Sequence, residues 1–223
     1  KEELNDILSI VETIYVRNNI ILNQRASVVE ASFWKWARRA NDQSISIDKL
    51  KKRMLRDIKD LSLEVSRDQF TSIFSGIHPD VNQATFLLSK IERFKTSKLD
   101  EISDFENISA LPIFPIVNIF DSLHEDWKKL TNVNSYLNEQ PQKRIGNYIL
   151  TKKKTFSQEY NLRNMRYKEK MPFLRRNTKK FKFTNDRFAQ DNFQYDFRPQ
   201  DIINLGDELA EIAVELWNFN NFE

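Results

Sequence analysis

Glycine is rare in this chain, and its scarcity narrows the folds that the chain can adopt. Only three glycines occur among 223 residues, while 40% of the residues are hydrophobic and 30% are charged. Few glycines together with long stretches of alternating charged and apolar residues favour helices. The length allows one large domain or two small ones, with enough residues to bury a core. We therefore expect a mainly α protein of the α+β class.

The first hundred residues carry the spacing of amphipathic helices, with apolar residues at i, i+3 and i+4. One such stripe runs from Leu4 to Tyr15, and another runs through Val81–Phe94. Ser46, with Lys49 three residues on, starts a helix, and the run from Ser66 to Gln69 has capping-box spacing. We interpret these stripes as a helical core. His78 beside Pro79 is interpreted as a turn residue.

The character of the sequence changes after residue 98. The segment Ile108–Phe120 is β-like and apolar, and Arg144–Thr151 is typical of a strand. Between them, Asp121–Leu130 is expected to form a short helix that carries Trp127. The segment Phe156–Lys170 is predicted to be a basic amphipathic helix, or a loop that leads into one. A last helix is predicted to begin near Pro199, because proline suits the first turn of a helix.

A basic segment lies at Pro141–Gln190. It holds fifteen Lys or Arg and three acids, a local net charge of +12, whereas the whole chain carries only +3. Aromatic residues alternate with these charges, which suits packing or base stacking on a nucleic acid. Such a segregation of charge usually serves the binding of a polyanion. The alternative is a solvated surface on which charge happens to cluster.

Several classes of site are excluded by composition. The chain has no cysteine and two histidines, so disulfides, cysteine-ligated zinc and His-rich metal sites are absent. The lack of cysteine fits a reducing compartment, and we expect a cytoplasmic protein with no membrane partner. The longest apolar run, Ile108–Phe120, is short and contains Pro112 and Pro115, so it is no membrane span. Since the chain begins at Lys1, we expect it to be part of a longer protein.

Four segments resemble a known family when they are taken in order. They are Val65–Phe94, Ile145–Leu150 (sequence IGNYIL), Asn164–Lys170 (NMRYKEK) and Asp201–Trp217. Together they resemble the C-terminal HNH-type (histidine–metal finger) domain of modification-dependent restriction proteins of the GmrSD and SspE kind. The resemblance implies a small ββα unit and an N-terminal ParB-like nucleotide-hydrolysing domain as a partner in the full-length protein.

The resemblance also implies domain boundaries. We expect a helical subdomain over residues 1–100, an HNH-like basic nucleic-acid-binding unit over 101–195, and a closing C-terminal helix over 196–223.

The catalytic motif of that family departs from its pattern in this chain. The resemblance implies a Glu-His pair after the first strand, and the corresponding positions hold Val117 and Asn118. Asparagine cannot act as a general base near neutral pH, so the standard catalytic histidine is replaced. A second register over Leu111–Pro115 also lacks histidine. His124 is the only nearby imidazole, and it is either a relocated base or metal ligand, or a half-exposed helix residue among acids.

The remaining candidate site residues follow from the same resemblance. Asn147 and Asn164 are retained, while Glu159 replaces an asparagine of the family. Asp121 and Glu159 are candidate ligands of a divalent cation, Mg²⁺ or Mn²⁺, if the domain is active. The cations expected to contact nucleic acid are Lys143, Arg144, Lys152, Lys153, Lys154, Arg163, Arg166, Lys170, Arg175 and Arg176.

Three functions remain open from the sequence. The first is a DNA-binding effector domain of a bacterial restriction or antiphage defence protein whose nuclease site is degenerate. The second is an active, divergent metal-dependent DNA endonuclease that nicks DNA with His124. The third is a helical protein-interaction domain whose basic stripe binds an acidic partner.

Overall fold

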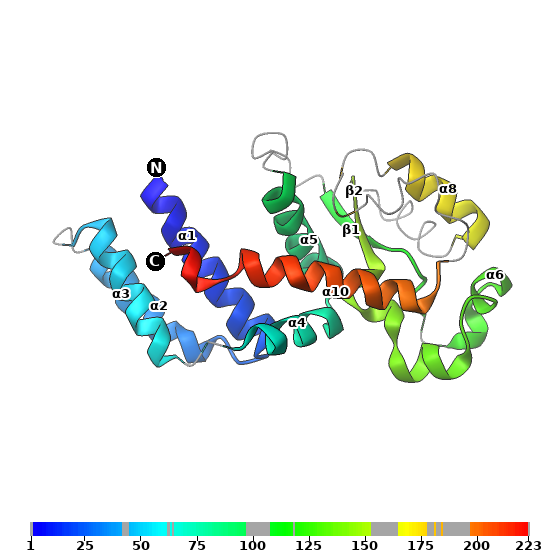
Figure 1. The fold of residues 1–223 in the computed structure, drawn as a ribbon, viewed down its shortest axis with the longest axis horizontal. Helices are drawn as coiled ribbons and strands as arrows, with labels where there is room; N and C mark the ends of the chain where they lie inside the picture. Colours follow the sequence, from blue (N-terminus) through cyan, green and yellow to red (C-terminus); the bar gives the residue numbers. More distant parts are fainter. Residues whose placement is uncertain are drawn as a thin grey trace. The chain divides into compact units, whose positions relative to one another are not determined.

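The structure is a computed structural model in which helices predominate and two strands form a small sheet (Figure 1). It describes residues 2–41, 45–61, 63, 65–96, 108–117, 119–152, 165–177, 181, 184 and 197–222. The predicted mainly α, α+β fold class is confirmed. Among the helices of these residues, none has both the length and the apolar character that a membrane span needs.

The chain packs as two compact units. Unit 1 comprises Lys1–Phe74 and Ala213–Glu223, and unit 2 comprises Ser75–Ile212. The predicted boundaries at residues 100 and 195 are those that the resemblance implied, whereas these limits follow packing and fall inside two helices. The three-part division therefore stays a prediction.

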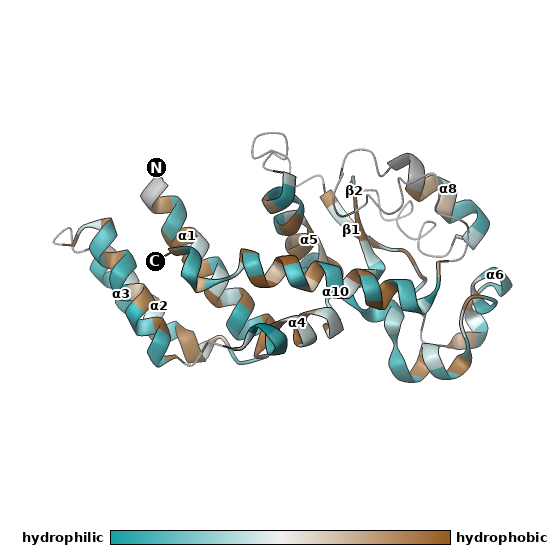
Figure 2. Cartoon of the chain, viewed as in Figure 1, coloured by the Kyte–Doolittle hydropathy of each residue, from teal (hydrophilic) through white to brown (hydrophobic). Residues whose placement is uncertain are grey.

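Unit 1 is helical in the residues that the structure describes. Its elements are α1 (Glu2–Tyr15), a π-helical turn (Val16–Ile21), α2 (Ser27–Asn41), α3 (Ile47–Asp60), most of α4 (Arg67–Gly76), the end of α10 (Pro199–Leu216) and a final 3₁₀ turn (Phe219–Phe222). Brown apolar and teal polar residues share these helices in Figure 2, as expected for amphipathic helices. The apolar faces form one core of Ile10, Ile14, Val29, Trp36, Leu50, Met54, Ile58, Leu63 and Phe219.

The predicted helix starts are confirmed in atomic detail. Ser66 and Gln69 form a reciprocal capping box, in which each side chain accepts a hydrogen bond from the other residue's backbone N–H, at 3.1 and 3.2 Å. Ser46 accepts from the backbone N–H of Lys49 at the start of α3. These local signals fix where helices begin without help from distant contacts.

A buried carboxylate joins α2 to α3 inside unit 1. Asp57 is 9% exposed and accepts a 2.9 Å hydrogen bond from the indole N–H of Trp36. Lys35 and Arg53 lie 3.1 and 3.5 Å from its carboxylate oxygens. Burial by itself raises the pKa of Asp57, but the hydrogen bonds from Trp36 and Lys35 and the charges of Lys35 and Arg53 lower it overall. Asp57 is therefore a charged link between the two helices.

Unit 2 is built around an antiparallel strand pair. Its main elements are the end of α4, α5 (Val81–Thr96), β1 (Ile108–Pro112), α6 (Glu125–Lys128), a π-helical turn (Ser135–Glu139), β2 (Tyr148–Lys152), α8 (Tyr167–Asn177) and most of α10. In the register, Ile108 faces Lys152 and Pro112 faces Tyr148. The apolar segment predicted over 108–120 is thus a strand only as far as Pro112, after which the chain leaves the sheet.

The second strand also starts later than the sequence predicted, at Tyr148 instead of Arg144. Ile145–Asn147 form a 3₁₀ turn, and in that turn the backbone of Gly146 lies against α10. A Cβ at Gly146 would overlap the backbone of Ile202 and Gly206. Two of the three glycines therefore serve one close backbone approach, which strand geometry at 145–147 does not provide.

Candidate nucleic-acid interface

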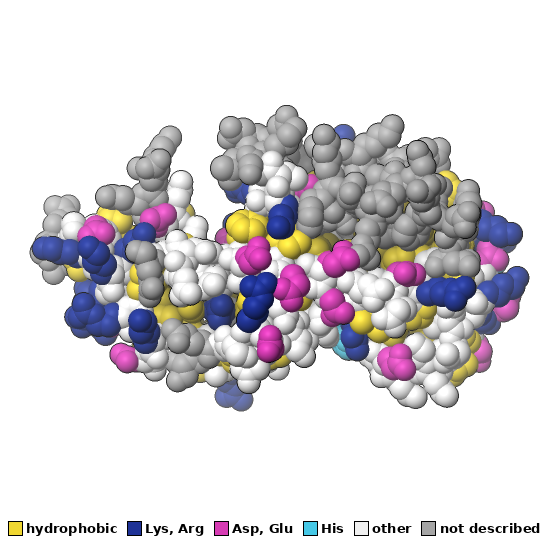
Figure 3. Space-filling view, in the orientation of Figure 1, with side chains coloured by type: hydrophobic (Ala, Val, Ile, Leu, Met, Phe, Trp, Pro, Cys, Tyr) yellow, Lys and Arg dark blue, Asp and Glu magenta, His cyan; other side chains and the backbone are white. Residues whose placement is uncertain are grey.

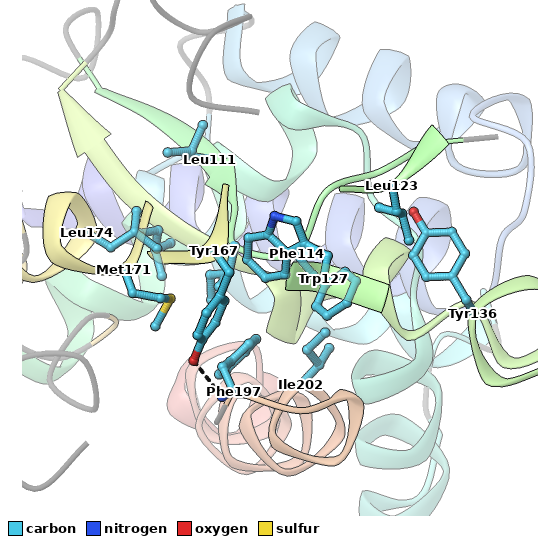
Figure 4. Close-up of a cluster of buried hydrophobic side chains, with 12 residues drawn as sticks. Leu111, Phe114, Leu123, Trp127, Tyr136, Tyr167, Met171, Leu174, Phe197 and Ile202 are labelled. Carbon is cyan, nitrogen blue, oxygen red and sulfur yellow. Dashed lines mark hydrogen bonds between the residues drawn. The ribbon is translucent and has the colours of Figure 1, made fainter. Parts of the chain in front are cut away.

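The strands and α8 form a ββα unit with a shared apolar core. Leu111 and Ile149 from the strands and Met171 and Leu174 from α8 belong to one buried cluster (Figure 4). This is the order of elements that the resemblance implied for residues 101–195. The sequence predicted a helix over Phe156–Lys170, or a loop that leads into one. The observed helix α8 runs from Tyr167 to Asn177 and shares only residues 167–170 with that range; residues 156–164 lie outside the described part of the chain.

Aromatic rings fix the segment before α8 to the rest of this core. Trp127 lies between Phe114 and Tyr167, with ring-centroid distances of 4.7 and 5.0 Å. Its indole N–H donates to the backbone oxygen of Met165 at 3.0 Å. The short helix predicted to carry Trp127 is observed as α6, so Trp127 anchors α6 to α8.

Asn147, one of the candidate site residues, is a structural residue in this arrangement. It is fully buried, and its side-chain oxygen accepts from the backbone N–H of Phe114 at 2.7 Å. Its amide nitrogen donates to the backbone oxygens of Phe114 and Gln142. These bonds hold the chain as it leaves β1 and leave Asn147 no face toward solvent.

His124 caps α6. Its Nδ1 accepts a 3.2 Å hydrogen bond from the backbone N–H of Asp126, and it lies 3.7 Å from the carboxylate of the same residue. A neutral ring that accepts through Nδ1 carries its proton on Nε2, so His124 could act as a base only by giving up this capping bond. The side chain is 37% exposed. His124 is thus a half-exposed capping residue of α6, and its proposed role as a base or metal ligand stays a prediction.

His124 shares a cleft with acidic residues. A hollow of about 450 Å³ is lined by Asp121, His124 and Glu125, together with Val117. Within the described residues, no three His, Asp or Glu side chains come together in a way that would hold a metal ion. Asn118, Glu159 and Asn164 lie outside the described residues. The candidate ligands that are described do not fit a Mg²⁺ or Mn²⁺ centre by themselves.

The predicted nucleic-acid-binding cations fall into four groups, of which buried Lys170 is the last. Lys152 and Arg166 are exposed, and Lys143 and Arg144 are half-buried. Arg175 and Arg176 belong to the C-terminal part of α8, and their side chains are outside the described part, as are Lys153, Lys154 and Arg163.

Lys170 differs from these cations because it is fully buried. Its ammonium lies 5.8 Å from the centroid of the Trp127 ring, close enough for a cation–π contact. This position places the charge inside the core of the ββα unit and away from any ligand at the surface.

His78 reports the sign of the local potential near the start of β2. It lies in the turn between α4 and α5, as the sequence predicted. Burial lowers its pKa, and the positive charges of Arg144 and then Lys143 lower it further. Burial is the largest cause and carries no sign of charge, so only the smaller contributions of Arg144 and Lys143 indicate a positive potential at His78.

A wide groove lies between α6, α8 and the start of α10. Its volume is about 880 Å³, and it is lined by Asp126, Lys129, Leu130, Tyr167, Lys168, Met171, Pro172 and Arg198. In Figure 3, Lys and Arg side chains lie near α6 and the adjacent end of α8, at the right of the view, with acidic side chains among them. Sequence reasoning did not select Lys129, Lys168 or Arg198. Lys168 lies inside the basic segment, but no sequence signal brings Lys129 and Arg198 beside it.

No protein-family model, curated protein or solved structure matches this chain. The resemblance to HNH domains therefore stays a prediction from the sequence motifs.

Proposed function

We propose that this chain is a DNA-binding domain built on an HNH-like ββα unit. The observation that carries the proposal is the cationic surface around this unit. Lys152 ends β2, Arg166 and Lys168 flank the first residue of α8, and all three are exposed. Cations held on strands and helices keep fixed spacings, which suits contacts to successive phosphates of a duplex.

The proposed biological role follows from the resemblance. The domain would act as the DNA-engaging effector of a bacterial restriction or antiphage defence protein, with a ParB-like nucleotide-hydrolysing domain elsewhere in the full-length protein. The position of the family histidine holds Asn118, and His124 has its Nδ1 engaged in capping. We therefore propose that the domain binds DNA and does not cleave it with the standard histidine base.

Salt dependence tests the proposal directly. Binding of a fluorescein-labelled 30-base-pair duplex is measured by anisotropy between 50 and 200 mM KCl. With about six phosphate contacts, affinity should fall roughly 10³-fold over this range, because each contact releases condensed counterions. A dissociation constant that does not change with salt would overturn DNA binding and favour an acidic protein partner.

Divergent nuclease activity is a second candidate, favoured by the cleft that His124 shares with Asp121 and Glu125. Supercoiled plasmid incubated with the protein and either Mg²⁺ or Mn²⁺ tests it. Nicking that disappears in His124→Ala would support this candidate. Intact plasmid with both metals would exclude it and leave DNA binding as the function.

A further inference from the structure

We infer that the groove between α6, α8 and the start of α10 binds one unstacked nucleotide of a DNA strand. The inference rests on the proposed DNA binding and goes beyond it by naming the part of the ligand that enters the protein. A groove of about 880 Å³ lies within the size range of small-molecule sites and has room for a nucleotide.

The floor of the groove is apolar and fixed. Met171 is 2% exposed and Tyr167 is 6% exposed. The hydroxyl of Tyr167 accepts a 3.0 Å hydrogen bond from the backbone N–H of Phe197, drawn as a dashed line in Figure 4. Leu130 and Pro172 complete the apolar lining. A floor of this kind offers apolar contact to the face of a base.

The rim of the groove is cationic on all three sides. Lys129 follows α6, Lys168 lies in the first turn of α8, and Arg198 precedes α10; all three are exposed. A nucleotide has the matching division, with an apolar base face at one end and a charged phosphate at the other. Among the lining residues that the structure describes, Asp126 is the only acid, and it is half-buried. Its carboxylate can accept a hydrogen bond from an exocyclic amino group such as that of adenine.

The charge pattern separates this ligand from an acidic peptide. A peptide would place carboxylates along its length and would meet Asp126 on the α6 wall as a like charge. A nucleotide keeps its charge at the phosphate and brings a hydrogen-bond donor to the interior. An unstacked nucleotide is therefore the occupant that the lining favours.

The test compares two duplexes that differ by one nucleotide. Anisotropy gives the dissociation constant of the 223-residue chain for a perfect 30-base-pair DNA and for the same DNA with one extrahelical adenosine. Extruding a base from a stack costs a few kcal/mol, and the protein does not have to supply this free energy when the adenosine is already extrahelical. We expect the bulged duplex to bind at least about tenfold more tightly, a ratio that corresponds to about 1.4 kcal/mol.

Two variants and a control assign the preference to the groove. Leu130→Trp should fill the groove and remove the preference while leaving the perfect-duplex affinity within about twofold. Lys168→Glu, at an exposed position, should weaken the bulged duplex more than the perfect one. Lys95→Glu makes the same charge change on α5, outside the groove, and should change both affinities by the same factor. Thermal melts establish that each variant is folded.

Each outcome separates the inference from the proposed function. Equal affinity of the unmodified chain for both duplexes overturns the nucleotide site and leaves DNA binding standing. The nucleotide site is also overturned if the folded Leu130→Trp variant and the Lys168→Glu variant both still prefer the bulged duplex, because the bulge would then be bound elsewhere. Failure to bind either duplex removes the proposed function, and the nucleotide site with it.

Discussion

Asn147 and Phe114 exchange two hydrogen bonds, one in each direction, between a side-chain amide and a backbone peptide. The backbone N–H of Phe114 donates to the side-chain oxygen of Asn147 at 2.7 Å, and the Asn147 amide donates to the Phe114 oxygen at 2.9 Å. The backbone oxygen of Asn147 also accepts from Ile113 at 2.7 Å. Asn147 therefore extends the strand pairing past Pro112, which has no N–H to donate.

Replacing Asn147 by alanine should destabilise the fold by about 2–4 kcal/mol, because buried backbone groups would lose their hydrogen-bond partners. Urea unfolding followed by tryptophan fluorescence measures the loss. Asn138→Ala, at an exposed position, is the matched control and should change stability by less than about 0.5 kcal/mol. Equal effects of the two substitutions would show that Asn147 has no such structural role.

The helices were predictable because their signals are local. The capping pair Ser66–Gln69 and the apolar stripe of α1 act within a few residues, and the structure reproduces both. Strand limits were less predictable, since the late start of β2 depends on Gly146 meeting α10 some 60 residues away in sequence. Local pattern contains no information about that contact.

The candidate site was predictable in composition and not in arrangement. The basic segment identified Lys152 and Arg166, which are exposed, but it also included Lys170, which lies under Trp127 in the core. Charge alone does not tell a surface lysine from a buried one. Lys129 and Arg198 were missed for the complementary reason, since they reach the groove from segments outside the basic stretch.

Asp57 should make the stability of unit 1 depend on pH. Its folded-state pKa is lowered, so its contribution is fully present above the unfolded value near 3.9 and is lost as pH falls through the folded value. The Tm of the unmodified chain, measured by thermal melts, should therefore decrease below about pH 4. Asp57→Asn should lower stability by about 1–3 kcal/mol at pH 7 and flatten that acid dependence. If Tm falls below about pH 4 to the same extent in Asp57→Asn, the pH dependence of stability comes from other carboxylates.

Gly146 and Gly76 provide a pair of identical substitutions with opposite expected signs. Gly146→Ala places a methyl group into the backbone of α10 and should cost about 3 kcal/mol or more. Gly76 ends α4, and a Cβ there meets nothing within 4 Å, so Gly76→Ala should stabilise by up to about 1 kcal/mol. Chemical denaturation of both variants measures the two values. Similar changes in stability at the two positions would contradict the close approach of the Ile145–Asn147 turn to α10.

Charge reversal should rank the two basic surfaces of the chain. The pair Lys152→Glu and Arg166→Glu changes exposed cations next to β2 and α8, and the pair Lys51→Glu and Lys52→Glu changes two lysines of α3. If DNA lies on the ββα unit, the first pair should weaken duplex binding more and should reduce the slope of log K against log salt by about 2, one for each lost phosphate contact. The second pair also breaks ion pairs with Asp6 and Asp48, at 2.8 and 3.0 Å, so melts must accompany the binding curves. A larger effect of the α3 pair in folded protein would move the DNA-binding face to unit 1.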